Sequence, residues 1–247
     1  MNFASRYLVV GDLHGNWRGL ERLLEQCRYD ESHDRLIFVG DYNDHMRPDT
    51  CDVRRLIDLL LELDRRSPQG VAFVRGNHDL WFAQWLKTGG VPDPNWYEQG
   101  GRETLMSYGL DSPSDAARHR ERIPEAHRSF ICERIIPYYL DAELLVVHGG
   151  FVSGEQMGLL AAGTPLDEAQ LMELVWDRHF IFSDDDRDHA WFAQYFGQRY
   201  LVTGHSAVGP YVNPRNPKWL LVDSPGRGRN LHAAIIRDGD NYEFIHS

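Results

Sequence analysis

The chain has 247 residues, enough for one α/β domain with a substantial core. Lysine and arginine total 26 against 37 aspartates and glutamates, and the net charge of −11 argues against binding nucleic acid through a broad basic face. The three cysteines lack CxxC spacing, which argues against a disulfide framework or a structural zinc site. With no signal-like start and no apolar stretch of about 18 residues, we expect a cytoplasmic protein without a membrane partner.

Short apolar runs define the predicted strands of the first third. They lie at residues 7–10, 36–39 and 71–74, and helical patterns at 17–27 and 53–63 separate them. This alternation predicts βαβ units and therefore a parallel sheet.

The rest of the chain changes character twice. Residues 80–137 read as mostly helical, and two further apolar runs follow at 144–147 and 200–202. After His205 we expect three strands, at 219–223, 231–237 and 242–246, which form a second sheet packed on the first. No long linker interrupts the pattern, so residues 1–247 are expected to form a single domain.

A side chain that can bind a metal follows five of the apolar runs. Loops at the carboxyl ends of parallel strands converge on one site, so we expect the following residues to meet: Asp12, His14, Asp41, Asn77, His148 and His205. Each motif alone is an ordinary turn or a buried histidine, and only their joint occurrence points to a site. Mixed aspartate, histidine and asparagine ligation suits Mn²⁺, iron, Zn²⁺ or Co²⁺.

Two such ions would explain a hydrolytic site. Held about 3.5–4 Å apart, they would lower the pKa of a shared water and clamp phosphoryl oxygens. The leaving oxygen then needs a proton, and His78, next to Asn77, is placed to give one. A carboxylate such as Asp44 would orient that imidazole and raise its pKa.

These motifs resemble those of the phosphoprotein phosphatase family of calcineurin-like metallophosphoesterases. The family pattern runs GDxHG, GDxxDR, GNH[ED], HGG or HAG, and GH, and it corresponds here to residues 11–15, 40–45, 76–79, 148–150 and 204–205. The chain is especially similar to small bacterial members, which include Ser/Thr protein phosphatases and diadenosine tetraphosphate hydrolases. Those members also tend to show stretches like 100–109 and a Trp-x-Arg element, here 176–178.

The resemblance implies a fold and a set of roles. The fold would be an α/β αββα sandwich of two mixed β-sheets flanked by helices. One metal would take Asp12, His14 and Asp41, and the second would take Asp41, Asn77, His148 and His205. The two divalent ions would be manganese, with iron, zinc, cobalt or nickel as alternatives. His78, paired with Asp44, would be the general acid, and Arg75 and Arg178 would bind the substrate phosphate.

One position departs from the family pattern, because His45 stands where GDxxDR has arginine. A histidine offers fewer donors than a guanidinium, and its charge depends on pH. His45 could bind phosphate when protonated, Arg47 could replace the missing arginine, or Arg75 and Arg178 could suffice. The site could also serve another substrate or turn over slowly.

Three functions follow from this interpretation. The first is hydrolysis of phosphate monoesters, in phosphoprotein or a small phosphate ester, by a metal-bound hydroxide. The second is hydrolysis of a dinucleoside tetraphosphate such as diadenosine tetraphosphate, and the third is a weakly active metal-binding module. We expect residues 87–101 and 184–188 to line the substrate groove, with Trp96 and Tyr97 as candidates for stacking on an adenine.

Overall fold

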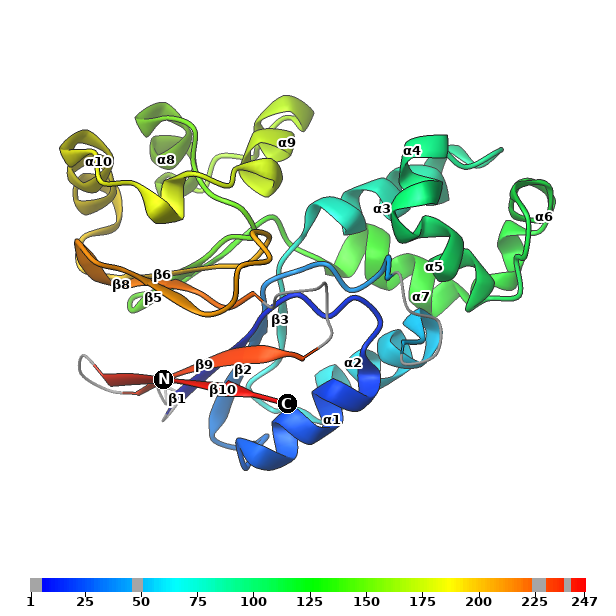
Figure 1. The fold of residues 1–247 in the computed structure, drawn as a ribbon, viewed down its shortest axis with the longest axis horizontal. Helices are drawn as coiled ribbons and strands as arrows, with labels where there is room; N and C mark the ends of the chain where they lie inside the picture. Colours follow the sequence, from blue (N-terminus) through cyan, green and yellow to red (C-terminus); the bar gives the residue numbers. More distant parts are fainter. Residues whose placement is uncertain (1–5, 46–50, 224–229, 238–240) are drawn as a thin grey trace.

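The computed structural model describes residues 6–45, 51–223, 230–237 and 241–247. Within these residues two five-stranded sheets lie face to face, and helices cover their outer faces (Figure 1). This arrangement confirms the predicted αββα sandwich of mixed sheets.

The first sheet has the strand order β10-β9-β1-β2-β3. Its strands are β1 (Arg6–Val10), β2 (Asp34–Phe38), β3 (Ala72–Phe73), β9 (His232–Arg237) and β10 (Asn241–His246). β1, β2 and β3 run parallel, joined by α1 (Trp17–Gln26) and α2 (Val53–Arg66), as the βαβ pattern predicts. The Asn16 and Asp52 side chains accept backbone N–H groups of the first turns of α1 and α2, and so fix where these helices begin.

The second sheet has the order β4-β5-β6-β8-β7. Its strands are β4 (Tyr139–Leu140), β5 (Leu144–Val146), β6 (Tyr200–Thr203), β7 (Tyr211–Asn213) and β8 (Asn216–Leu221). Of the three strands predicted after His205, only the first belongs here. β9 instead pairs antiparallel with β1, and β10 pairs antiparallel with β9, so the prediction that they form the second sheet is wrong.

Helices make up most of the remaining described elements, and they lie outside the facing sheets. The segment predicted to be mostly helical contains α3 (Asn77–Thr88), α4 (Pro94–Trp96), η1 (Tyr97–Gly101), α5 (Arg102–Met106), α6 (Pro113–Arg118), η2 (Arg120–Arg122), α7 (Glu125–Ser129) and η3 (Phe130–Arg134). Outside the second sheet lie α8 (Gly154–Ala161), α9 (Glu168–Trp176), η4 (Phe180–Phe182) and α10 (Asp186–Phe196). No described helix is both long and apolar enough to cross a bilayer.

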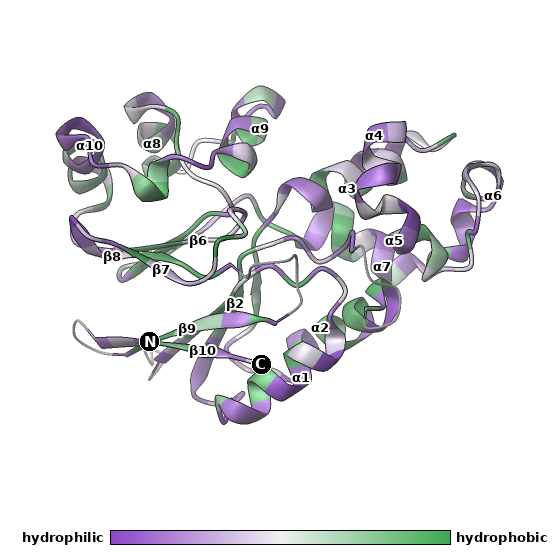
Figure 2. Cartoon of the chain, viewed as in Figure 1, coloured by the Kyte–Doolittle hydropathy of each residue, from purple (hydrophilic) through white to green (hydrophobic). Residues whose placement is uncertain are grey.

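Buried apolar side chains separate into clusters that match these layers. One cluster, which includes Val9, Ile37 and Val202, joins the facing surfaces of the two sheets. A second packs the first sheet against α1, α2 and α3, and a third packs the second sheet against α8 to α10. Several strands carry hydrophobic stretches, while β10 and the outer helices are mixed (Figure 2). Burial of these faces aligns the two sheets, and with them the loops that leave their strands.

Candidate metal centre

The predicted ligands leave the carboxyl ends of parallel strands in both sheets. Asp12, Asp41 and Asn77 follow β1, β2 and β3, while His148 and His205 follow β5 and β6. The Asp79 carboxylate ties two of these loops together, because it accepts the backbone N–H groups of Asp41, Tyr42 and Gly76 at 2.9, 2.9 and 2.8 Å. His14, Asp41 and His205 have positive φ angles of 42, 51 and 69°. Such conformations are strained for these residue types and are concentrated at functional sites.

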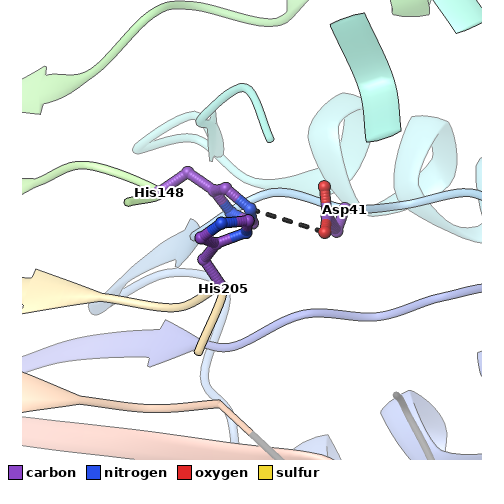
Figure 3. Close-up of side chains that lie close together, drawn as sticks. All are labelled: Asp41, His148 and His205. Atoms are coloured by element: carbon purple, nitrogen blue, oxygen red, sulfur yellow. Dashed lines mark ion pairs between the residues drawn. The ribbon is translucent and has the colours of Figure 1, made fainter. Parts of the chain in front are cut away.

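Asp41 is common to two groups of potential metal ligands. One group is Asp12, His14 and Asp41, and the other is Asp41, His148 and His205. Asp41 Oδ2 lies 3.7 Å from Nε2 of His14 and 3.4 Å from Nε2 of His148. Figure 3 shows the Asp41 carboxylate facing the neighbouring rings of His148 and His205.

Backbone carbonyls orient two of the imidazoles for ligation. Nδ1 of His14 lies 2.9 Å from the Asn43 carbonyl, and Nδ1 of His148 lies 3.2 Å from the Val39 carbonyl. Each Nδ1–H can therefore donate outward and leave Nε2 as a lone-pair donor, the arrangement typical of metal-binding histidines. His148 Nε2 also lies 3.1 Å from Oδ1 of Asn77, so this amide oxygen belongs to the same cluster.

His205 supplies a direct test of whether the residues fit a metal. Its Nε2 is buried and has no hydrogen-bond partner among the described residues. A buried nitrogen without a hydrogen-bond partner destabilises the fold unless another group, such as a metal ion, contacts it. The surrounding donors are carboxylate, imidazole and amide groups, a set that suits divalent transition ions. The chain's residues thus fit the divalent ions expected from the sequence.

A cavity of about 90 Å³ opens over these ligands. Its lining includes Asp12, His14, Asp41, His78, Arg178, His205, Ala207 and Asp223. Burial, with Asp223 and Asp41 nearby, raises the pKa of Asp12 well above its ordinary value. Burial also opposes ionisation of Asp41, but the imidazoles of His148 and His78 outweigh it and hold its pKa well below the ordinary value. The cavity therefore concentrates carboxylates that a cation would stabilise.

Two of the histidines favour the neutral form. Burial lowers the pKa of His14 to about 4 and, together with the nearby His148, lowers the pKa of His205 to about 2. A neutral imidazole is the form that binds a metal. These two imidazoles are thus in the form that a metal ion would bind at neutral pH.

His78 lies beside this cluster and contacts Asp44. Its Nδ1 is 2.9 Å from Asp44 Oδ2, and both side chains are buried. The His78 ring packs edge-on against His14, with ring centroids 5.2 Å apart, and it lines the cavity. The predicted pair is therefore brought together at the site.

The three predicted phosphate-binding residues do not all lie in the cavity. Arg178 lines the cavity and donates from Nη1 to the His205 carbonyl at 2.6 Å. Arg75 is buried and turns to the opposite side, where Nη2 donates to the carbonyls of Ile131 and Ile135 at 3.2 and 3.1 Å. His45 is buried against Gly15, close enough that a Cβ on that glycine would lie 2.9 Å from its Cδ2. Arg47 lies outside the described residues.

Asp223 is a cavity residue that the sequence argument missed. It follows β8, is 2% exposed, and accepts the backbone N–H of Ala207, two residues beyond His205. The signal was present, because the predicted strand 219–223 ends in an aspartate just as the other runs end in metal-binding residues. The carboxylate therefore supports the His205 loop from a sixth strand end.

Two grooves contain parts of the predicted substrate-binding segments. One, of about 690 Å³, has Trp81, Pro92 and Asn95 in its lining, and the other, of about 520 Å³, includes Arg187 and Asp188. Trp81 packs edge-on against His78, with centroids 5.2 Å apart. Trp96, expected as a stacking platform, is only 1% exposed.

Comparison with known proteins identifies the family to which this sequence is similar. The family model for calcineurin-like phosphoesterases matches residues 5–209. The symmetrical bis(5'-nucleosyl)-tetraphosphatase of Legionella pneumophila is 28% identical over 202 residues, which cover 81% of this chain and 60% of that protein. The enzyme of the same name from Dechloromonas aromatica is 29% identical over 144 residues, or 58% of this chain and 43% of that protein. This chain thus spans less than two thirds of these relatives.

Solved structures share the fold at low sequence identity. A protein serine/threonine phosphatase from Saccharomyces cerevisiae superposes with a TM-score of 0.64 at 18% identity, over 98% of this chain and 79% of that chain. A candidate diadenosine tetraphosphatase superposes with a TM-score of 0.58 at 19% identity, over 100% and 95% of the two chains. With the shared fold, the convergent ligands and a family match across most of its length, this chain belongs to the calcineurin-like phosphoesterases.

Proposed function

We propose that this chain hydrolyses phosphate esters or anhydrides with the help of two divalent ions. The observation that carries the proposal is that two ligand groups share Asp41 beside the His78–Asp44 pair. Asp12 and His14 would complete one ion's ligands, and Asn77, His148 and His205 the other's. When bound, the ions would supply an activated water and neutralise phosphoryl charge.

The remaining residues would act on the substrate. His78 would deliver a proton from Nε2 to the leaving oxygen, because its Nδ1 is held by Asp44. Arg178, in the lining of the cavity, would donate to a phosphoryl oxygen in a charge-assisted hydrogen bond. Arg75 and His45 remain predicted phosphate-binding residues, although they would have to turn away from their present contacts.

We propose a dinucleoside tetraphosphate as the substrate. The relatives whose names specify this reaction align over as many as 202 residues of this chain. The groove that Trp81 lines supports the choice, because Trp81 also packs against His78, which would protonate the leaving group, and the groove is large enough for a nucleoside. Metal ions at the site would reconcile a polyanionic substrate with the acidic chain.

Phosphate monoesters are the second candidate. The cavity of about 90 Å³ has room for a single phosphoryl group, and its lining does not itself select for a nucleotide. The serine/threonine phosphatase that shares the fold supports this alternative only through its architecture.

Product analysis tests these proposals. Metal-stripped protein would be incubated with diadenosine tetraphosphate or p-nitrophenyl phosphate, with and without Mn²⁺, and the products separated by ion-exchange chromatography. Cleavage between the central phosphates consumes one water and gives two molecules of ADP. We expect ADP in the presence of Mn²⁺ and none with the Asp41→Ala variant.

Other products would redirect the assignment. Formation of AMP and ATP would show that a different phosphoanhydride bond of the polyphosphate is cleaved. Release of phosphate from p-nitrophenyl phosphate, with no cleavage of diadenosine tetraphosphate, would favour the monoesterase. A protein that binds two ions yet turns over neither substrate with any divalent metal would contradict a phosphohydrolase and favour the binding module.

A further inference from the structure

Asp44 makes more contacts than its pairing with His78 requires. The side chain is fully buried, and Trp96 Nε1 donates to Oδ2 at 2.6 Å while Thr104 Oγ1 donates to Oδ1 at 2.7 Å. Thr104 Oγ1 also accepts the backbone N–H of Asp44 at 2.9 Å. Both carboxylate oxygens are therefore engaged, and Oδ2 is shared between the indole and the imidazole of His78.

The two donors come from a helical segment that lies far from Asp44 in the sequence. Trp96 ends α4, Thr104 lies in α5, and the Gly100-Gly101 pair lies between them. A Cβ on Gly100, whose φ is +113°, would lie 2.7 Å from the Asp44 carbonyl carbon, and one on Gly101 would lie 2.6 Å from the Trp96 ring. Glycine is needed at both positions for the segment to close on Asp44.

We propose that Trp96 and Thr104 are positioning residues for the general acid, acting through Asp44. With donors on both oxygens, the carboxylate cannot rotate, so Oδ2 stays aimed at His78 Nδ1 and the opposite ring nitrogen stays aimed at the cavity. Both donors are neutral, so they satisfy the buried oxygens without adding a positive charge that would compete with a protonated imidazole. The inference rests on the proposed function, because it needs a reaction in which His78 delivers a proton.

The test compares leaving groups that differ in their need for that proton. The variants Thr104→Val and Trp96→Phe each remove one donor and keep most of the side chain's volume. We expect kcat to fall about tenfold or more on phenyl phosphate, a part of the 10²–10⁴-fold worth of general acid catalysis. On p-nitrophenyl phosphate, whose leaving group needs no proton, we expect a loss below about threefold, with KM unchanged on both substrates. Thr104→Ser should restore the rate.

Trp85→Phe is the matched control. Trp85 is buried in the same aromatic cluster, with its ring centroid 5.7 Å from that of Trp96, but its Nε1 donates to the Gly90 carbonyl at 3.0 Å. Loss of this donor disturbs the same packing without touching Asp44. The variant should keep the leaving-group dependence of the parent protein, and an equal change in both tryptophan variants would overturn the proposal.

A spectroscopic measurement separates the inference from the proposed function. In metal-free protein labelled with ¹⁵N-histidine, the His78 Nδ1–H resonance, assigned by its loss in His78→Gln, reports the contact with Asp44. We expect it to shift or broaden in Thr104→Val and Trp96→Phe and to persist in Trp85→Phe. If the parent protein turns over neither these two monoesters nor diadenosine tetraphosphate, the proposed function fails while this signal still measures the positioning. An unchanged resonance in both Thr104→Val and Trp96→Phe would refute the positioning role.

Discussion

Asp41 is the residue on which both candidate ion sites depend, because each group of ligands includes it. Asp41→Ala should therefore abolish binding of both ions. Asp12→Ala should remove ligands from one site only and leave close to one ion per chain. Metal content after dialysis against Mn²⁺, measured by mass spectrometry, checks both expectations.

The exposed Asp184 provides the control for that experiment. Asp184→Ala changes the net charge by the same amount at a distance from the ligands, so its metal content should equal that of the parent. Retention of both ions by Asp41→Ala would rule out a shared carboxylate ligand.

The two predicted phosphate-binding arginines should respond differently to substitution. Arg178→Ala should raise KM about 10- to 100-fold, because a charge-assisted hydrogen bond contributes about 1.5–3 kcal/mol. It should cost little stability, because Arg178 is exposed and water can replace its hydrogen bond to the His205 carbonyl. Arg75→Ala should instead destabilise the protein by about 2 kcal/mol or more, since the carbonyls of Ile131 and Ile135 would lose their donor.

Urea denaturation with steady-state kinetics separates the two effects. If Arg75→Ala raised KM and left stability unchanged, Arg75 would act as a phosphate-binding residue after all. The matching result for Arg178, a stability loss without a kinetic effect, would remove it from the site.

At the scale of elements, His127 connects three helical segments. Its Nδ1 lies 3.0 Å from the hydroxyl of Tyr108, which follows α5, and its Nε2 lies 2.9 Å from a carboxylate oxygen of Asp58 in α2. Burial lowers the pKa of His127, although Asp58 opposes the shift. The folded chain therefore binds this proton less readily than the unfolded chain does.

The sign of the pH dependence follows from that difference. The contribution of His127 to stability is present above its unfolded pKa of about 6.5 and is lost as the pH falls from that value through the lowered pKa of the folded chain. Between pH 7 and 5 the free energy of unfolding of the chelator-treated protein should fall more steeply than that of His127→Gln, by at most about 1.4 kcal/mol per pH unit. Urea titrations at each pH measure the slopes.

A second histidine variant controls for the general effect of losing an imidazole. His33 is largely exposed, with its Nδ1 2.9 Å from Asp30, so the slope of His33→Gln should stay closer to that of the parent than the slope of His127→Gln does. Equal slopes in the parent and His127→Gln would show that the buried contact has no linkage to folding.

Across the whole molecule, the candidate ions would join the two sheets. Asp12, His14, Asp41 and Asn77 come from loops of the first sheet, whereas His148 and His205 come from the second. Bound Mn²⁺ should therefore stabilise the folded chain as a unit, by about 2.7 kcal/mol for each site at a free concentration 100 times Kd. Thermal unfolding with Mn²⁺ or chelator measures the increment.

Removal of a ligand from the second sheet tests this coupling. His205→Ala should lose a large part of the Mn²⁺-dependent increment while keeping the stability of the chelated parent, or exceeding it, because it also removes the orphaned Nε2. An unchanged increment would show that the ions stabilise the first sheet alone.

The parts of this fold that the sequence predicts are those with a local signal. Strand, loop and helix alternate within the first third, and Asp12 and Asp41 follow their strands directly, so their convergence could be anticipated. The pairing of β9 with β1 has no local signal, because partners such as Val9 and Ala234 are distant in the chain. The direction of Arg75 and the burial of Trp96 depend on helices packed later, which periodicity does not reveal.

The place of β1 between β2 and β9 has a consequence for synthesis of the chain. β1 gains its parallel neighbour β2 early, but its other edge is covered only when β9, the penultimate strand described, has left the ribosome. Until then an apolar strand presents unpaired backbone groups that another chain could extend. A nascent chain stalled before residue 232 should therefore depend on chaperones that shield strand edges, and released full-length protein should not.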